Sequence, residues 1–270
     1  MSRHYFVEST LRGFAQALSR ALASEQLATR RGLLQAFDPR VRLFGVLSLV
    51  VATTISRRFS VIGFLFAWAV LMALASGIRL RTLATRVWLI VLGFTGVIAL
   101  PAILITPGNT VVAFGGLSLT EQGLRTAALL ILRVETAVTL TTTLVLCTRW
   151  THILKSLRAV RVPAEVITML AMTHRYIFLF IETAGQMFES RQSRMIGALS
   201  GPEQRRMASR TAGVLLSKSI DLSEEVYLAM LSRGFRGDVQ LISEFRMRAL
   251  DYFGLAACLL LAGTTAWMGR

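Results

Sequence analysis

The sequence predicts an all-α, polytopic membrane protein with about five transmembrane helices and a cytoplasmic module of amphipathic helices. Hydrophobic residues make up 54% of the 270 positions and charged residues only 17%, whereas soluble domains carry about 25% charged residues. The mean hydropathy is +0.58. Basic residues outnumber acidic ones by 30 to 15 and collect in a few segments, as they do on the cytoplasmic side of membrane proteins. A net charge of +15 in so apolar a chain therefore indicates orientation in a lipid bilayer, with no nucleic-acid partner.

Five segments are apolar enough to cross a bilayer, whose core of about 30 Å needs roughly 20 helical residues. They are residues 41–56, 59–78, 87–106, 126–148 and 252–267. The first is short and needs its flanks or a tilted neighbour to span. The third belongs to an uncharged stretch that Pro101 and Pro107-Gly108-Asn109 interrupt, so we expect one helix followed by an exposed connection.

Charged residues mark the start of the first span and the interior of the fourth. Asp38 can cap a helix, and Pro39 fits its first turn. Arg133 and Glu135 lie inside the fourth span, where charge is costly and usually faces protein or water. Because they are two residues apart, they do not share a helix face. We expect each to pair with a neighbouring helix, and a direct part in transport is the alternative.

Residues 149–249 differ from the spans in composition, because they contain half of the chain's basic residues. Val166, Leu170 and Ile177 recur at helical spacing, which indicates amphipathic helices. His174-Arg175 interrupt this apolar pattern, and a central charge costs about 2.5 kcal/mol or more in a bilayer, so we expect no crossing here. The chain then divides into an N-terminal arm (1–40), a membrane domain of about four spans (41–148), this module (149–249) and a C-terminal transmembrane helix (250–270).

The basic residues also predict the orientation of the chain in the membrane. The N-terminal region and the module carry many arginines, whereas the connection 106–120 has no Lys or Arg. The N-terminus and the module are therefore expected in the cytoplasm. Arg57-Arg58 opposes this orientation, because it falls in a hairpin predicted to lie outside.

Two Ser-Arg pairs stand near predicted helix ends in the module. Ser193-Arg194 follows one apolar pattern, and Ser232-Arg233 follows another that Gly234 is expected to terminate. Asp221 or Ser223 is the expected N-cap of that second helix. A small residue lets a partner approach closely, and arginine offers a planar fork to a carboxylate. Two ordinary solvated arginines at helix C-termini are the alternative.

The order of several motifs resembles the transmembrane T component of energy-coupling-factor (ECF) transporters over residues 32–237. ECF transporters are ABC importers in which a separate S component binds the substrate and paired ATPases supply the energy. The motifs are Asp38-Pro39-Arg40-Val41-Arg42-Leu43, Leu117-Ser118-Leu119-Thr120-Glu121-Gln122-Gly123-Leu124 with Arg133 and Thr141-Thr142-Thr143, Val162-Pro163, His174-Arg175-Tyr176 and Ala229-Met230-Leu231-Ser232-Arg233-Gly234-Phe235.

The resemblance implies an energy-coupling role for the module through two short Ala-Arg-Gly-like motifs on coupling helices. Ser232-Arg233-Gly234 matches the second motif. Ser193-Arg194-Met195 matches the first through its arginine and the small residue before it, and Arg191 is the alternative anchor. The implied partners are two ABC ATPase subunits, a membrane-embedded S component and the lipid bilayer of a bacterial plasma or inner membrane.

Within that family the long arm and the stretch 31–35 look most like the cobalt and nickel (CbiQ-like) permease subunits, and a vitamin-type T component is the alternative. The histidines His4, His152 and His174 lack ligand spacing, so we expect no metal site and no cofactor. No Gly-rich loop ends in Gly-Lys-Ser/Thr, so ATP hydrolysis falls to partner subunits and the chain is not expected to be an enzyme. An integral-membrane enzyme acting on lipid, or a self-sufficient carrier, are the rival classes.

Overall fold

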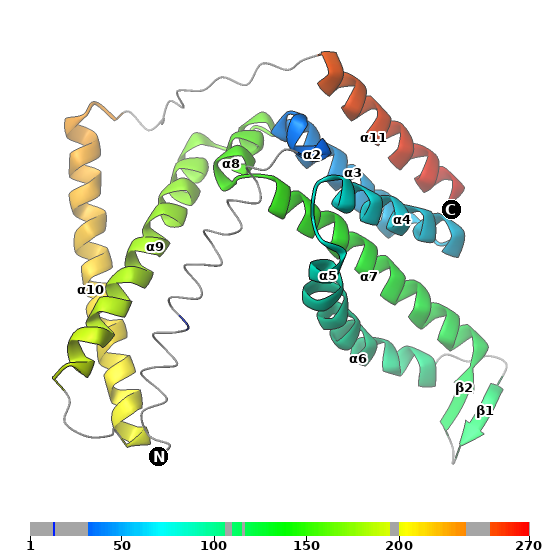
Figure 1. Ribbon diagram of the computed structural model, residues 1–270, viewed down its shortest axis with the longest axis horizontal. Helices are drawn as coiled ribbons and strands as arrows, with labels where there is room; N and C mark the ends of the chain where they lie inside the picture. Colours follow the sequence, from blue (N-terminus) through cyan, green and yellow to red (C-terminus); the bar gives the residue numbers. More distant parts are fainter. Residues whose placement is uncertain are drawn as a thin grey trace. The chain divides into compact units, whose positions relative to one another are not determined.

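The computed structural model describes residues 13, 32–105, 110–114, 117–194, 200–235 and 249–269 (Figure 1). Its elements follow the chain as α2 (Leu33–Ala36), α3 (Pro39–Ile55), α4 (Phe59–Ala75), α5 (Leu80–Leu83), the π-helical turn η1 (Ala84–Trp88), α6 (Leu89–Ile105), β1 (Thr110–Phe114), β2 (Leu117–Thr120), α7 (Glu121–Cys147), α8 (Trp150–Ala159), α9 (Ala164–Gln192), α10 (Gly201–Ser232) and α11 (Ala249–Met268).

The chain forms two compact units. The membrane unit comprises Leu27–Ser156 and Phe245–Arg270, and the α9–α10 unit comprises Met1–Gln26 and Leu157–Glu244. The boundary between them falls inside α8. It lies close to the predicted boundary at residue 149, and it groups the C-terminal helix with the earlier spans.

The predicted spans correspond to α3, α4, α6, α7 and α11, which confirms a helical, membrane-type fold. By length and composition α7 and α11 can each cross a membrane, and α4 and most of α6 are shorter apolar helices. Pro101 lies inside α6 without ending it, in agreement with the single helix expected over residues 87–106. A proline inside a helix is tolerated in membranes where neighbouring groups take up the freed carbonyl.

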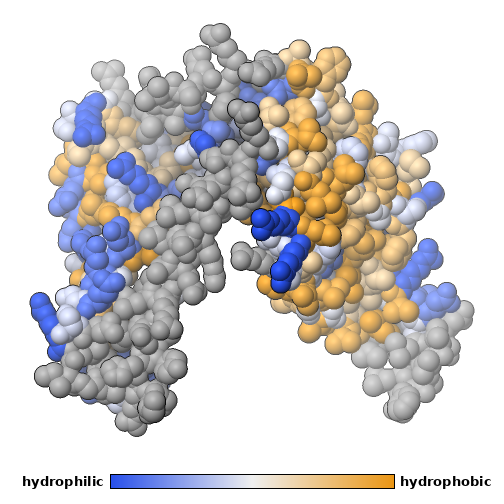
Figure 2. Space-filling model, viewed as in Figure 1, coloured by the Kyte–Doolittle hydropathy of each residue, from blue (hydrophilic) through white to orange (hydrophobic). Residues whose placement is uncertain are grey.

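The core of the membrane unit lies where α3, α4, α7 and α11 meet. Leu49, Leu65, Leu140 and Ala262 are buried there in one cluster. Outside this core the helices expose large apolar side chains, among them Phe94, which is 72% exposed. Figure 2 shows hydrophobic residues over most of the visible face of this unit. Such a surface suits acyl chains, because lipid demands no polar covering.

The connection that the sequence predicts between α6 and α7 contains a β-hairpin. β1 and β2 pair antiparallel, with Thr110 opposite Thr120 and Phe114 opposite Leu117. Thr120 then caps α7, because its Oγ1 accepts a hydrogen bond of 3.1 Å from the Gly123 N–H. Backbone pairing satisfies polar groups that a plain loop would leave to water. Pro107-Gly108-Asn109 lies outside the described residues.

The α9–α10 unit contains two long helices, of 29 and 32 residues. The expectation of an N-cap at Asp221 or Ser223 is wrong, because both residues lie inside α10. The helix begins earlier, at Ser200, whose N–H and Oγ both donate to Glu203 Oε2, at 2.8 and 2.7 Å. This is the Ser-x-x-Glu capping pattern, a signal that the sequence carries.

α9 meets the length and hydropathy criteria for a membrane span over Ala164–Arg191. Only 6% of the residues in its most apolar stretch of 18 residues are buried. Its apolar residues suit either a bilayer or a protein partner. The expectation that this helix stays outside the bilayer therefore remains a prediction.

Candidate functional site

The Ser232-Arg233-Gly234 motif terminates α10 in a tight and well-defined turn. Gly234 has φ +79°, a left-handed conformation that favours glycine. Its N–H donates to the Leu231 carbonyl at 2.9 Å, and the Phe235 N–H donates to the Met230 carbonyl at 3.0 Å. This pair of bonds is a Schellman C-cap. The stop expected at Gly234 is therefore observed, and it places Arg233 at the exposed tip of the helix.

Ser193-Arg194 occupies a similar position at the end of α9. The Ser193 N–H donates to the Glu189 carbonyl at 3.0 Å, and the Arg194 N–H donates to the Arg191 carbonyl at 3.1 Å. Both residues are exposed, whereas Arg191 is half-buried. Arg194 is therefore the more accessible of the two candidate anchors. Met195 lies outside the described residues.

The serines of the two motifs adopt the same local geometry. Ser193 Oγ donates to the Ser190 carbonyl and Ser232 Oγ donates to the Ala229 carbonyl, each at 2.9 Å. Each hydroxyl is thus folded back onto its own helix, and the arginine that follows it is exposed at the helix end. Within the described ranges neither Arg194 nor Arg233 is paired with a carboxylate. A cation suits a helix C-terminus, and a guanidinium there is also free to bind a partner carboxylate.

An apolar groove of about 700 Å³ runs between α9 and α10. Met172, Tyr176 and Val226 line it, and Met230 and Phe235 belong both to the groove and to the Schellman turn that holds Arg233. Thioether and aromatic side chains adapt to varied apolar partners. The groove and Arg233 therefore form one continuous surface at the end of α10.

The Asp38–Leu43 motif has a packing role in the membrane unit. Asp38 Oδ1 accepts a hydrogen bond from the Arg40 N–H at 2.9 Å, and the Asp38 N–H donates to Asp251 Oδ1 of α11 at 2.8 Å. The Arg42 guanidinium donates to the carbonyls of Gln35, Phe37 and Cys147. The motif thereby joins the starts of α3 and α11 to the end of α7.

Arg133 fulfils the expectation of a partner on a neighbouring helix. Its Nη2 donates to the carbonyl of Ser56 at the end of α3, at 2.7 Å. Glu135 departs from that expectation, because both of its carboxylate oxygens are buried without a hydrogen-bond partner in the described part of the chain. Arg57-Arg58 is exposed in the turn between α3 and α4, where nothing in the structure explains its charge.

The two described histidines lie on different helices. His152 lies in α8, and His174 lies in α9 with its ring edge-to-face on Phe178 at 5.1 Å. Burial lowers the pKa of His152, and the nearby Arg149, Arg42 and Lys155 lower it further. Among the described residues no group of three His, Cys, Asp or Glu side chains could hold a metal ion. His4 lies outside those residues.

Comparison with known proteins identifies the class of this membrane protein. A protein of Methanocaldococcus jannaschii, named only as uncharacterized, is 28% identical over 90% of this chain and 85% of its own length. The cobalt transport protein CbiQ of Rhodobacter capsulatus is 28% identical over 56% of this chain and 63% of its own length. The energy-coupling factor transporter transmembrane protein EcfT of Brevibacillus brevis is 29% identical over 81% and 86%.

The fold and these relatives define a transmembrane T component of the energy-coupling-factor type, as the motifs predicted. Residues 31–242 match the family described as CbiQ, cobalt transport protein. The chain belongs to the CbiQ family. It is therefore a multi-pass membrane protein of a transporter family, and its named relatives are transporter components.

Proposed function

We propose that this chain is the energy-coupling subunit of an ECF-type importer and transmits ATPase movements to a separate substrate-binding S component. The observation that carries the proposal is the pair of exposed Ser-Arg helix ends, which share one local geometry. Two equivalent tips suit two ATPase subunits, each of which would bind one guanidinium through a carboxylate. The N-terminus and the α9–α10 unit lie in the cytoplasm in this scheme.

The long helices give the coupling a physical route. When ATP binding draws the ATPases together, each tip moves with the subunit that holds it, and α9 and α10 shift as rigid rods. The groove between these helices changes shape with them. An S component whose apolar surface rests on the groove would then follow the movement, because methionine and aromatic side chains repack easily.

The transported substrate we propose is the cobalt ion, with nickel and vitamins as the alternatives. A relative bears the name cobalt transport protein, and the matching family has the same description. The described residues of this chain lack a cluster of metal ligands. That leaves recognition of the ion to the S component.

Charge reversal at the two tips tests the proposal. Arg194→Glu and Arg233→Glu together should prevent co-purification of the full chain with its ATPases and abolish ATP-driven uptake of radiolabelled Co²⁺ in vesicles. Breaking one side of a buried charge pair costs about 2–5 kcal/mol, which weakens binding by about 30- to 5,000-fold. Arg206→Glu, on an exposed position in the first half of α10, is the matched control.

The results discriminate between anchors and ordinary solvated arginines. Assembly and uptake should survive in the control and fail in the double variant. If both survive in the double variant, Arg194 and Arg233 are not the anchors. Competition of the uptake by unlabelled Ni²⁺ or by vitamins, in the unaltered complex, identifies the substrate class independently of the anchors.

A further inference from the structure

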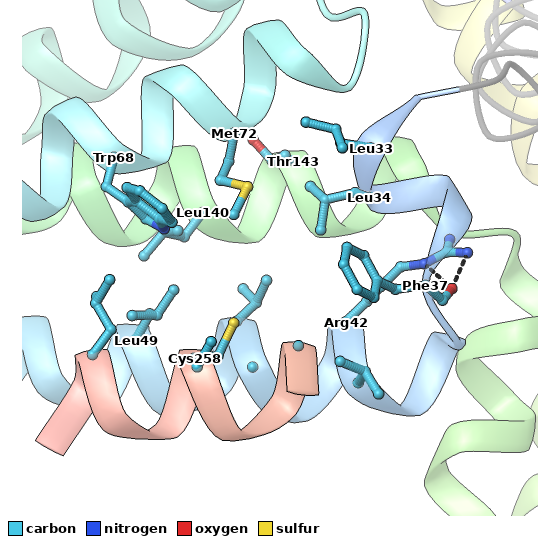
Figure 3. Close-up of a pocket in the computed structure, with 16 residues that line it drawn as sticks. Leu33, Leu34, Phe37, Arg42, Leu49, Trp68, Met72, Leu140, Thr143 and Cys258 are labelled. Carbon is cyan, nitrogen blue, oxygen red and sulfur yellow. Dashed lines mark hydrogen bonds between the residues drawn. The ribbon is translucent and has the colours of Figure 1, made fainter. Parts of the chain in front are cut away.

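An apolar cavity of about 330 Å³ lies within the membrane unit, well away in sequence from both Ser-Arg tips (Figure 3). Its walls come from α2, α3, α4, α7 and α11 and from the residues that join α2 to α3. Leu34, Phe37, Leu49, Trp68 and Met72 are among the side chains that surround it. The volume falls in the range of about 300–1,000 Å³ that small-molecule sites occupy.

The cavity wall has few groups that could form a hydrogen bond with a water molecule. Arg42 and Thr143 are its charged and hydroxyl-bearing side chains. The Arg42 guanidinium is engaged by three backbone carbonyls, and Thr143 Oγ1 donates to the Thr139 carbonyl at 2.7 Å. The Trp68 indole and the Cys258 thiol are the polar groups left, whereas a buried water typically needs two to four partners. The cavity therefore favours an apolar occupant, since an empty one loses dispersion contacts.

The cavity reaches the surface of the membrane unit. Two of its lining residues, Leu33 of α2 and Ala257 of α11, are exposed, and Leu33 is 58% exposed. The opening at Leu33 adjoins the end of α4, because a Cβ on the preceding Gly32 would lie 3.0 Å from Ser76 Cα. An apolar chain in the surrounding bilayer can enter at such a rim without crossing water.

Two cations follow that end of α4. Arg79 precedes α5 and Arg81 lies in it, three and five residues after Ser76, and both are exposed. Basic residues at a membrane surface attract anionic headgroups. The cavity and these arginines thus provide complementary surfaces for the two ends of one amphipathic molecule.

We propose that this cavity binds one acyl chain of an anionic phospholipid, with the headgroup phosphate held near Arg79 and Arg81. The chain fills the space between α3, α4, α7 and α11 and takes up contacts that these helices do not make with one another. The site is independent of the energy-coupling role, because it uses none of the residues of the two tips.

Photocrosslinking of the full-length chain in nanodiscs tests the site. The probe is a phosphatidylglycerol with a diazirine in one acyl chain, diluted in phosphatidylcholine, and adducts are located by peptide mass spectrometry. Adducts are expected on Leu49 and Leu140, which are 3% and 4% exposed and do not face the bilayer. Cys258→Phe, which fills the cavity, should remove them. Leu260→Phe, on a position 69% exposed outside the cavity, should retain them.

A comparison of phosphatidylglycerol and phosphatidylcholine probes tests the role of Arg79 and Arg81 in binding the headgroup. Arg79→Gln with Arg81→Gln should reduce the preference for phosphatidylglycerol over a phosphatidylcholine probe by about 10- to 30-fold, the effect of two basic residues near the surface. An equal yield with both probes on the unaltered chain would overturn the assignment of an anionic lipid.

The dependence of adduct yield on the mole fraction of probe tests the site even if Cys258→Phe does not fold. On the unaltered chain, adducts at Leu49 and Leu140 should saturate as the mole fraction of probe rises, whereas adducts on Leu260 should rise in proportion to it. Adducts confined to outward residues, or a proportional rise at all positions, would show that no acyl chain occupies the cavity.

Discussion

At the residue scale, Arg42 joins three helices at one end of the predicted membrane bundle. One buried guanidinium donates to carbonyls of α2, of the α2–α3 connection and of the end of α7. The sequence identified the neighbouring Asp38 as a cap, which the Asp38 bond to the Arg40 N–H bears out. The acceptors of Arg42 and Arg133 could not be predicted from the sequence. They are backbone carbonyls, which every residue type carries.

Removal of the Arg42 side chain should therefore destabilise the membrane unit strongly. Each buried carbonyl that loses its donor costs about 1–3 kcal/mol. Arg42→Ala should lower the melting temperature in detergent by about 10 °C or more. The melting temperature of Arg42→Lys should lie between those of the unaltered chain and Arg42→Ala. One ammonium group cannot reach all three carbonyls as the planar guanidinium does. Arg58→Lys, on an exposed arginine, is the control. A melting temperature unchanged in Arg42→Ala would refute this clamp.

At the scale of the secondary-structure element, hydrophobic runs and cap residues differ in how well they predict structure. The apolar segments located α4, α6, α7 and α11 because a bilayer needs long uncharged helices whatever their neighbours. Polar helices outside a bilayer need no such apolar run, so their bounds are harder to predict. Asp221 and Ser223 resemble an N-cap locally, yet α10 continues through them from a start at Ser200. The end at Gly234 was predictable, because a left-handed residue strongly favours glycine.

The start of α10 should be sensitive to acid. Hydrogen bonds from the Ser200 side chain and backbone lower the pKa of Glu203. A lowered pKa in the folded state means that the cap stabilises the helix above the ordinary glutamate pKa of about 4.3 and loses this effect as the pH falls through the folded value. Hydrogen-exchange protection of the first turn of α10 should therefore decrease below about pH 4.3.

Two variants isolate the carboxylate at this cap. Glu203→Gln keeps a side chain that can accept from Ser200, and its protection should not change with pH in this range. Glu203→Ala should show low protection at every pH. Equal pH dependence in the unaltered chain and in Glu203→Gln would assign the effect to another group.

At the scale of the whole molecule, the chain forms a membrane unit and an α9–α10 unit, whereas the basic residues predict an arm, a membrane domain, a module and a C-terminal helix. The apolar excess lies mainly in α3, α4, α6, α7 and α11, and α9 is the element for which composition and charge disagree. It is apolar enough to span, yet His174-Arg175 occupies its middle. Few of its residues are buried in the chain alone. A protein partner and a bilayer would both bury that surface, so the side of the membrane on which α9 lies must be measured.

Cysteine accessibility decides the placement of α9, and with it the cytoplasmic position of the two Ser-Arg tips. In a chain carrying Cys258→Ala, the buried Cys147 remains as an unreactive residue. Ala171→Cys, on an exposed position of α9, should react with a membrane-impermeant maleimide in inside-out vesicles and not in right-side-out ones. Val97→Cys, on an exposed position of the predicted span α6, should react in neither. With the chain expressed without partner proteins, protection of Ala171→Cys in both vesicle types would place α9 across the bilayer. Burial of its apolar surface would then outweigh the cost of about 2.5 kcal/mol for its central charge.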